Sequence, residues 1–547
     1  MTEPLPVSIA PELFFGLVAP IGVDLDLVTN ALDRSLQEMD YKAREFRLTK
    51  LMKEVPTGLS LAPDPYIQSY RDRIAYANEV RRLLGDDALA CLAISAIRSF
   101  RADERKERYA EKGDEQDSRD EPDSDESVEE APLSKQAYLI RQIKRPEEVA
   151  LLRSVYGRQF ILVSAYAPQE ARKRRIEALE RRSRGGLISD VDASSRAHEL
   201  VAQDAKESLD KHGQNVRDAF PLGDVFIDAS RGSCEVMVRR FVDLLFGSNE
   251  VTPTHDEYGM YIAKSASLRS SDLSRQVGAA IFRTSGEVVT LGCNEVPKAG
   301  GGTYWSEEPG DSRDFVEGHD PNELRKFEVL VDVLDRLRKG GHLSAELMNI
   351  MDSQKIGELL LIDKSETSVS ESRIMDILEF GRTIHAEMSA ICDASRKGIS
   401  VEKGTLYCTT FPCHICAKHI VAAGLLRVVY LEPYPKSYAF ELHQDSIVVD
   451  YDGSSDKVKF DAFIGVSPYR YRDLFEKGKR KYSSGLAQKW SQGKKRPMIE
   501  VYYPSYFKAE TQVVGLMRRR LEEILASQQL SVALLAPSEK PLSADGG

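Results

Sequence analysis

Two short motifs constrain this chain more than any other feature. His385 and Glu387 lie two residues apart, and Cys413 and Cys416 lie three apart directly after Pro412. One imidazole and two thiolates give Zn²⁺ three protein ligands and leave the fourth tetrahedral position open for water, as in catalytic and not structural zinc sites. Glu387 is not needed as a ligand, so we predict that it is the acid–base residue beside that water.

The residues around the two motifs predict a helix after each. Small and apolar residues follow His385, which places it in the first turn of a buried helix, and Pro412 suits the start of a second helix at Cys413. We therefore expect two helix N-termini, with their positive dipole ends, to converge on the metal. A lone C-x-x-C is often a structural half-site or a redox pair, but the combined order favours catalytic zinc. We expect His414 and His419 outside the ligand set, and Cys392 and Cys408 in the core.

A wider resemblance begins at about Tyr258. The passage 261–282, Y-I-A-K-S-A-S-L-R-S-S-D-L-S-R-Q-V-G-A-A-I-F, and G-C-N-E-V-P-K at 292–298 are similar to the deoxycytidylate deaminase branch of the cytidine deaminase superfamily. The resemblance implies a three-layer α/β/α domain with one Zn²⁺ that hydrolyses dCMP, dCTP or both to deoxyuridine nucleotides and ammonia. It also implies substrate contacts from Asn294, on the sugar, and Arg269. The family's aromatic residue and second glycine beside that Asn are Cys293 and Glu295 here.

The more specific resemblance is to bacterial antiphage deoxycytidylate deaminases, which join an N-terminal P-loop kinase-like domain to this deaminase. It implies defence by nucleotide depletion, a homo-oligomer and restraint by a regulatory RNA. The alternatives are a housekeeping dCMP deaminase for dTTP synthesis and a nucleic-acid editing cytidine or adenosine deaminase. The 261–282 passage and the Asn294 loop favour the nucleotide branch, so no DNA substrate is expected.

The N-terminal region has the layout of a phosphate-binding loop. Residues 12–36 read as an apolar strand, a glycine-containing loop and a helix, but G-x-x-x-x-G-K-[ST] is absent. Ala19 and Asp24 replace its two glycines, and aspartate repels phosphate unless a metal intervenes. We predict a degenerate nucleotide-binding loop containing Ala19, Gly22 and Asp24, with a nucleotide effector and Mg²⁺ as its ligands, and an active nucleotide kinase is the alternative.

The remaining N-terminal region alternates strands and helices, which predicts a parallel sheet with helices on both faces. The order resembles nucleoside monophosphate kinases, whose lid carries arginines that grip phosphates. Arg172, Arg174 and Arg175 suit such a lid, and a solvated basic helix face is the equal alternative.

The predicted domains follow from these patterns. The kinase-like domain covers 1–245, with a disordered insertion at 101–133, since Arg101–Ala131 holds 14 acidic against 6 basic residues. The deaminase domain covers 246–506, and amphipathic helices in its insertion, 303–380, are expected to pack as core or form an oligomer interface. A C-terminal helix and a disordered tail make up 507–547.

Two further segments are candidates for binding. Lys436 and Ser437 follow a strand and are expected to contact the substrate phosphate. The segment 477–496 has eight Lys or Arg with Tyr482 and Trp490 interleaved, which suits a nucleoside triphosphate or RNA, or a plain soluble hairpin.

The composition of the chain indicates the cellular compartment in which we expect the protein. No run of eighteen apolar residues and no N-terminal signal pattern occurs, so we expect a cytoplasmic protein without membrane contact. Seven cysteines, two of them assigned to metal, favour a reducing compartment. The net charge of −11 disfavours nucleic acid as a partner, although the charge is unevenly placed.

Overall fold

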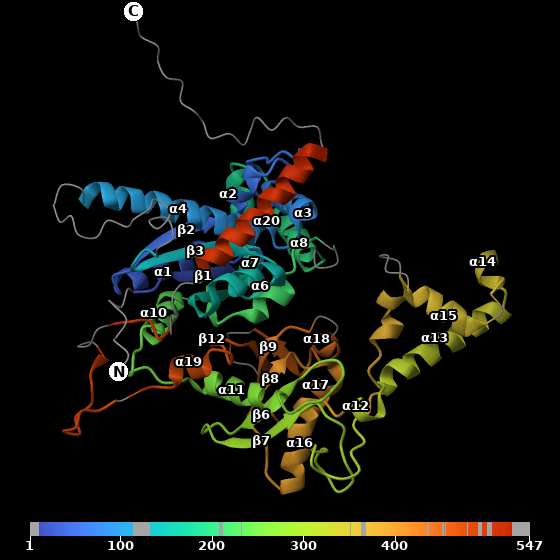
Figure 1. The fold of residues 1–547 in the computed structure, drawn as a ribbon. Coiled ribbons are helices and arrows are strands. Elements are labelled where there is room, and N and C mark those ends of the chain that lie inside the picture. The colour runs from blue at the N-terminus through green and yellow to red at the C-terminus, as the bar shows by residue number, and fades with distance from the viewer. Residues whose placement is uncertain are drawn as a thin grey trace, which may run out of the picture. The chain divides into compact units, whose positions relative to one another are not determined.

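The computed structural model divides into two compact units, here called unit 1 and unit 2 (Figure 1). Unit 1 comprises Met1–Pro253 together with Ile464–Gly547, and unit 2 comprises Thr254–Phe463. Within the described ranges, no helix is both long enough and apolar enough to cross a membrane. The described residues are 10–112, 132–206, 212–230, 232–350, 352–362, 368–434, 437–450, 453, 456–478, 480–490, 495–499 and 506–527.

Among its described residues, unit 1 forms a six-stranded sheet in the order β12-β5-β4-β1-β3-β2. The first five strands of the chain run parallel, and β12 pairs antiparallel with β5. The central strand, L-F-F-G-L-V, is buried along its whole length, as expected where helices cover both faces. The strands are β1 (Leu13–Val18), β2 (Lys42–Arg47), β3 (Gln136–Ile143), β4 (Phe160–Tyr166), β5 (Val225–Asp228) and β12 (Gly465–Val466).

Helices cover both faces of this sheet, which confirms the predicted arrangement. Alternate residues of β1 point to opposite faces: Phe14 packs with α3, α4, α6 and α20, whereas Phe15 packs with α1 and α10. The helices are α1 (Leu25–Gln37), α2 (Leu48–Leu51), α3 (Tyr66–Leu84), α4 (Ala88–Lys112), α6 (Pro146–Tyr156), α7 (Gln169–Ser183), α8 (Asp190–Lys206), α9 (Val216–Ala219), α10 (Cys234–Leu245), α19 (Tyr471–Phe475) and α20 (Tyr506–Ser527).

A buried charge network joins four distant segments of unit 1. Arg101 on α4 donates from Nε to Glu12 (3.0 Å) and from both terminal nitrogens to Glu510 on α20 (2.7 and 3.0 Å). Glu12 also accepts from the hydroxyls of Tyr138 and Tyr506, at 2.6 Å each. All three charged side chains are at most 1% exposed, so each depends on the others for its compensation.

The predicted disorder at the start of the acidic segment is wrong. The sequence predicts disorder over 101–133, but residues 101–112 continue α4, because Arg101 is held in the interior. Leu133 is also buried, and its N–H donates to Glu12. The rest of that acidic segment, 113–131, lies outside the described residues.

The structure also places a domain boundary differently from the sequence. The prediction assigns residues up to 506 to the deaminase domain, but from Ile464 onward the chain groups with unit 1. Strand β12 pairs with β5 there, and α20 packs into the core of the same unit. Unit 2 is therefore inserted between two parts of unit 1.

The described part of unit 2 also forms a six-stranded sheet, in the order β10-β11-β9-β8-β6-β7. Strand β6 pairs antiparallel with β7 and with β8, and the remaining pairs are parallel. The strands are β6 (Gly278–Phe282), β7 (Val288–Cys293), β8 (Thr405–Thr410), β9 (Arg427–Glu432), β10 (Ile447–Val449) and β11 (Val458–Ala462).

Helices cover the two faces of this sheet, so the predicted three-layer α/β/α arrangement is confirmed (Figure 1). A Cβ at Gly278 would meet α11, and a Cβ at Gly292 would meet α16 on the opposite face. Helices α16 and α17 share one hydrophobic cluster with Ala279 and Ile281 of β6. The helices are α11 (His255–Ser267), α12 (Asp314–Glu317), α13 (Pro321–Lys339), α14 (Ala345–Met348), α15 (Ser353–Ile362), α16 (Ala386–Lys397), α17 (His414–Ala422) and α18 (Ala439–Leu442).

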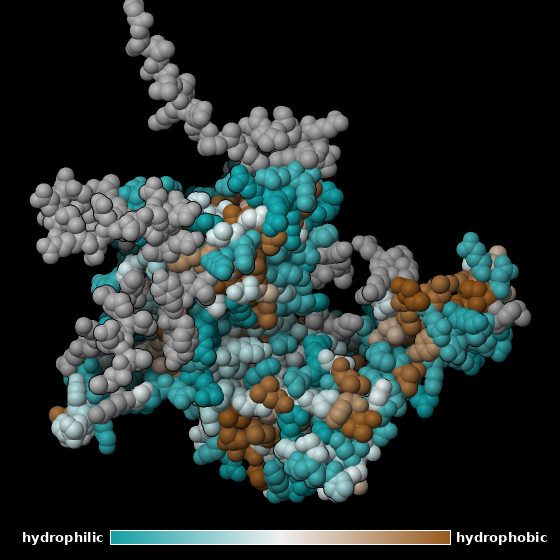
Figure 2. Space-filling view, viewed as in Figure 1, coloured by the Kyte–Doolittle hydropathy of each residue, from teal (hydrophilic) through white to brown (hydrophobic). Residues whose placement is uncertain are grey.

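The insertion 303–380 contains the predicted amphipathic helices as α13 and α15. Leu330, Leu334 and Ile356 are buried between them and form a small cluster of their own. Leu324 and Leu359 remain about half exposed, so the pair has apolar surface on its outside (Figure 2).

The buried network of unit 1 generates a stability prediction. Arg101→Ala would leave the carboxylates of Glu12 and Glu510 buried without their counter-ion. We expect the free energy of unfolding of unit 1 to fall by about 3 to 5 kcal/mol. Urea denaturation of a Trp305→Phe background, in which Trp490 is the remaining tryptophan and lies in unit 1, measures this loss.

Lys106→Ala is the matched control for this experiment. Lys106 is exposed on the same helix, so its replacement should change the free energy by less than about 0.5 kcal/mol. An equally small change for Arg101→Ala would contradict the proposed role of the network.

Candidate active site

His385 and Glu387 lie at the start of α16. His385 is the N-cap residue, with extended backbone angles (φ −67°, ψ 154°). Glu387 follows in the first turn and is 4% exposed. Apolar residues of the same helix, Ala386 and Ala390, are fully buried against the sheet, which fixes the helix in place. The predicted position of His385 in the first turn is confirmed to within one residue.

Cys413 and Cys416 lie in the equivalent position on α17. Cys413 is the N-cap residue (φ −68°, ψ 165°), and its sulfur accepts from the N–H of Cys416 at 3.5 Å. Both cysteines are buried. The predicted convergence of two helix N-termini is therefore observed.

The three ligand atoms fit Zn²⁺. His385 Nδ1 lies 3.3 Å from Cys413 Sγ and 3.3 Å from Cys416 Sγ. Ligands at ordinary Zn–S and Zn–N distances and tetrahedral angles lie about 3.6 Å apart, which is close to this spacing. Within the part of the chain that the structure describes, these residues form the one cluster of His, Cys, Asp and Glu suited to a metal.

The environment of the cluster matches metal binding. A hydrogen bond from the Cys416 side chain, together with the nearby His385, lowers the pKa of the Cys413 thiol to about 4. The contact with Cys413 raises the pKa of His385 to about 9. The lowered pKa of Cys413 favours its thiolate form, which is the form that binds a metal cation.

Glu387 has the environment of an acid–base residue. Burial raises the pKa of its carboxyl group above the ordinary value. Its Oε2 lies 3.5 Å from Cys416 Sγ, so the carboxyl group is directly beside the ligand cluster. A buried carboxyl group with a raised pKa can both accept and return a proton near neutral pH.

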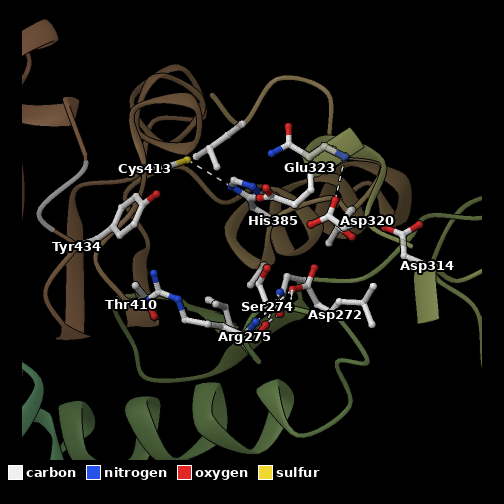
Figure 3. A pocket seen from close by; sticks show the side chains of 18 of the residues that line it. Asp272, Ser274, Arg275, Asp314, Asp320, Glu323, His385, Thr410, Cys413 and Tyr434 are labelled. Atoms are coloured by element: carbon white, nitrogen blue, oxygen red, sulfur yellow. Dashed lines mark hydrogen bonds between the residues drawn. The ribbon is translucent and has the colours of Figure 1, made fainter. Parts of the chain in front are cut away.

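A cavity of about 260 Å³ opens onto these residues (Figure 3). His385, Glu387 and Cys413 line it, so a ligand inside it would meet both the metal ligands and the acid–base residue. Its walls come from the segment 272–277, from the insertion, and from Tyr434 after β9.

Asn294 lines the cavity, as the predicted sugar contact would. Its side chain also holds the neighbouring backbone of residues 275–277, because Oδ1 accepts from Val277 N and Nδ2 donates to Arg275 O, each at 2.7 Å. The adjacent Glu295 is buried and accepts from the N–H and hydroxyl of Ser271 at 3.0 and 2.6 Å. These two residues therefore fix the 271–277 segment.

Two other predicted substrate contacts do not line the cavity. Arg269 donates to the carbonyls of Thr303 and Tyr304 and lies 3.7 Å from the ring centre of Trp305, so it braces the start of the insertion. Ser437 donates to the carbonyl of Pro412 at 2.7 Å and so holds the turn before Cys413. The third, Lys436, lies outside the described residues.

The predicted nucleotide-binding loop of unit 1 is occupied by the protein's own groups. Lys144 donates to the carbonyl of Ala19 at 2.7 Å, and Arg175 pairs with Asp24 at 2.9 Å. Gly22 has φ +87°, and a Cβ there would lie 2.8 Å from the carbonyl oxygen of Arg172 on α7. Helix α7 thus packs directly on the loop, and its binding of a nucleotide with Mg²⁺ stays a prediction.

Of the remaining residues that the sequence singled out, some lie where we predicted and others do not. His414 packs against Tyr438, and Cys408 is buried as predicted, whereas Cys392 is exposed and its predicted place in the core is wrong. In the basic segment 477–496, Trp490 donates to the carbonyl of Phe246, and Lys495 lies over its ring. Those contacts belong to unit 1, and the RNA partner stays a prediction.

Sequence reasoning misses the part of the insertion that reaches the cavity. Asp314, Asp320, Asn322, Glu323 and Lys326 line it, although the sequence predicts only core packing or an oligomer interface for these helices. The available signal is weak: D-P-N-E, residues 320–323, opens α13 with polar side chains at a capped N-terminus.

Comparison with known proteins identifies the region around this site. Residues 253–432 match the family described as "Cytidine and deoxycytidylate deaminase zinc-binding region". Deoxycytidylate deaminase of Enterobacteria phage T4 is 48% identical over 54 residues, which are 10% of this chain and 28% of the phage protein. The ComE operon protein 2 of Bacillus subtilis (strain 168) is 42% identical over 66 residues, 12% of this chain and 35% of that protein.

More distant relatives match over longer stretches. The probable deoxycytidylate deaminase of Drosophila melanogaster is 25% identical over 178 residues, 32% of this chain and 58% of that protein. A solved structure of dCMP deaminase from the cyanophage S-TIM5, in complex with dCMP and dUMP, is 17% identical over 39% of this chain and 99% of that chain, with a TM-score of 0.21.

The chain spans between 28% and 58% of the length of these three curated relatives. The family match covers the cavity wall that begins at Asp272, both helix N-termini and all three ligand residues. Residues 253–432 therefore match a cytidine and deoxycytidylate deaminase zinc-binding region, and His385, Cys413 and Cys416 form the zinc site within this match.

Proposed function

We propose that unit 2 catalyses the hydrolytic deamination of deoxycytidine nucleotides, dCMP or dCTP, to deoxyuridine nucleotides with release of ammonia. The observation that carries the proposal is the buried Glu387 carboxyl group beside the zinc ligands, in a cavity that the deaminase family region lines. The curated relatives named as deoxycytidylate deaminases support a deoxycytidine nucleotide as the substrate.

The reaction needs a nucleophile and a proton carrier. When His385, Cys413 and Cys416 hold Zn²⁺, the metal supplies the Lewis acidity that makes water a nucleophile near neutral pH. Glu387 takes a proton from that water and gives it to ring N3 of the cytosine. The water oxygen bonds to C4, the bond from C4 to the exocyclic nitrogen breaks, and Glu387 passes the second proton of the water to the departing ammonia.

The packing around Glu387 suits this shuttle. Its carboxyl group is buried, so bulk water does not compete for its protons. Its raised pKa makes the carboxylate a better acceptor for the proton of the attacking water. The N-terminus of α16 keeps the carboxylate form accessible, because the helix dipole favours negative charge there.

We also propose, from the sequence resemblance alone, that this activity depletes deoxycytidine nucleotides in antiphage defence. A housekeeping role in dTTP synthesis is the alternative with the same chemistry. The homo-oligomer and the regulatory RNA implied by the same resemblance belong to this proposal.

The first prediction concerns the proton carrier. Glu387→Gln should keep about one zinc per chain and lower kcat for dCMP or dCTP by about 100-fold or more, because the amide cannot carry protons. Ammonia release by the zinc-loaded protein, measured separately with dCMP, dCTP, CMP, cytidine and a deoxycytidine-containing single strand, checks both the activity and its substrate. Glu402→Gln, an exposed position of unit 2, is the control. Near-normal turnover of the Glu387 variant would refute the assigned role.

The second prediction concerns the metal. Cys413→Ala removes one of three ligands, so zinc and turnover should be lost together. Zinc content by mass spectrometry, with Cys392→Ala as a control that removes an exposed cysteine, checks this. Full zinc content in the Cys413 variant would exclude that residue from the ligand set.

The third prediction concerns the biological role. Cells that express the wild-type chain should lose dCTP and dCMP after phage infection and yield fewer phage than cells that express Glu387→Gln. Nucleotide pools and plaque counts measure this. Equal plaque counts, with active enzyme in both infected and uninfected cells, would favour the housekeeping role.

A further inference from the structure

The charges around the cavity are unevenly distributed. Asp272, Asp314 and Asp320 lie on one side of His385 in Figure 3, and Tyr434 lies on the other. All three carboxyl groups line the cavity. Burial raises the pKa of Asp314, Arg382, which pairs with it at 3.1 Å, lowers this pKa, and the charges of Asp320 and Asp272 raise it. Two of these three, Asp314 and Asp320, belong to the insertion, which thus supplies most of an acidic wall.

The cations that line the cavity are not equivalent. Lys326 is buried and donates to Glu323 at 2.5 Å and to the carbonyl of Met375 at 2.9 Å, so its charge is already compensated. Arg275 is exposed, and no described carboxylate forms an ion pair with it. Its guanidinium lies over the ring of Tyr434, 5.5 Å from the centre. The free cation is therefore held on the side where Tyr434 lies.

A nucleotide presents two chemically different ends to such a cavity. The 5′ end carries a phosphate, which pairs strongly with a guanidinium. The 3′ end of a free nucleotide carries a hydroxyl group, which can donate a hydrogen bond to a carboxylate. A 3′-phosphate would instead bring negative charge against the acidic wall, and like charges in a confined site disfavour binding strongly.

We propose, on the basis of the proposed deaminase function, that the cavity selects a cytosine deoxynucleotide whose 5′-phosphate pairs with Arg275 and whose 3′-hydroxyl is free. Asp272 and Asp320 of the acidic wall reject a 3′-phosphate, whereas the charge of Asp314 is compensated by its ion pair with Arg382 at 3.1 Å. Nucleosides bind weakly because they leave Arg275 without its partner.

This charge distribution also separates free nucleotides from nucleic acid. Every internal deoxycytidine of a strand has phosphate on both the 5′ and the 3′ side. One of them would meet Arg275, and the other would meet the acidic wall. The insertion therefore acts as a filter against strands, in addition to any part it has in assembly.

The first test compares substrates with the zinc-loaded full-length protein. We expect kcat/KM for 5′-dCMP to exceed that for deoxycytidine 3′,5′-bisphosphate, which keeps the 5′-phosphate and adds only the 3′-phosphate, by at least about 100-fold. Both 3′-dCMP and the dinucleotide dCpdC, assayed at its 5′ cytosine, should react no faster than deoxycytidine. Arg275→Ala should raise KM for 5′-dCMP by about 10- to 100-fold and leave kcat/KM for deoxycytidine nearly unchanged. Arg275→Lys should restore part of the loss. Arg283→Ala, which removes an exposed arginine that does not line this cavity, should change neither.

The second test removes the acidic wall without removing its turns. Asp272 accepts from the N–H groups of Ser274 and Arg275, and Asp320 accepts from that of Asn322. Asparagine can keep these bonds while losing the charge. The double variant Asp272→Asn, Asp320→Asn should raise kcat/KM for 3′-dCMP at least about tenfold relative to 5′-dCMP.

The outcomes distinguish this inference from the function on which it depends. An equal loss for 5′-dCMP and deoxycytidine in Arg275→Ala would overturn the phosphate contact while leaving the deaminase intact. Efficient deamination of 3′-dCMP or dCpdC by the wild type would overturn the acidic filter. No deamination of any of these compounds by zinc-loaded wild type would overturn the proposed function and this inference together.

Discussion

The candidate site depends on two helices that begin beside each other. His385 and Cys413 are both N-cap residues, and a cap residue has an extended backbone that turns its side chain across the end of the helix. Their ligand atoms can meet at 3.3 Å only if α16 and α17 are fixed against the same face of the sheet. Gly292 makes this possible for α16, because a Cβ there would lie 2.1 Å from the carbonyl oxygen of Ala386. The closeness of helix to sheet thus determines the metal geometry.

Several polar side chains near the site hold backbone in place and do not point into open space. Asn294 binds both Arg275 O and Val277 N, and Ser437 binds Pro412 O, in each case across a loop. These bonds determine where the cavity walls lie. A cavity that recognises a small polar ligand needs rigid walls. Hydrogen bonds from side chains to backbone hold these loops rigid without filling the cavity.

The sequence was sufficient to predict the metal ligands, because their positions depend on residue spacing within one or two helical turns. The H-x-E and C-x-x-C motifs identify residues that local helix geometry brings to one end of each helix. It was insufficient for Asp314, Asp320 and Lys326, because their place in the cavity depends on how the insertion returns to the sheet, which no local pattern encodes. It was also insufficient for Arg269, whose guanidinium is taken up by the carbonyls of the insertion. Residue type and spacing predicted the layers of sheet and helices in each unit, but not which polar residues line the cavity, and the kinase-like character of unit 1 stays a prediction.

Unit 1 is built from two separate parts of the chain, and this is why the predicted end of the deaminase domain at residue 506 was wrong. Alternation of strands and helices identifies elements in order, so residues after the metal motif read as a continuation of the deaminase. The actual assignment depends on pairing between elements hundreds of residues apart: β12 adds to the edge at β5, and Glu510 closes the charge network of Arg101 and Glu12. A buried arginine with two carboxylates is costly unless all three groups are present. Unit 1 therefore reaches its complete interior only when the chain beyond unit 2 has returned to it.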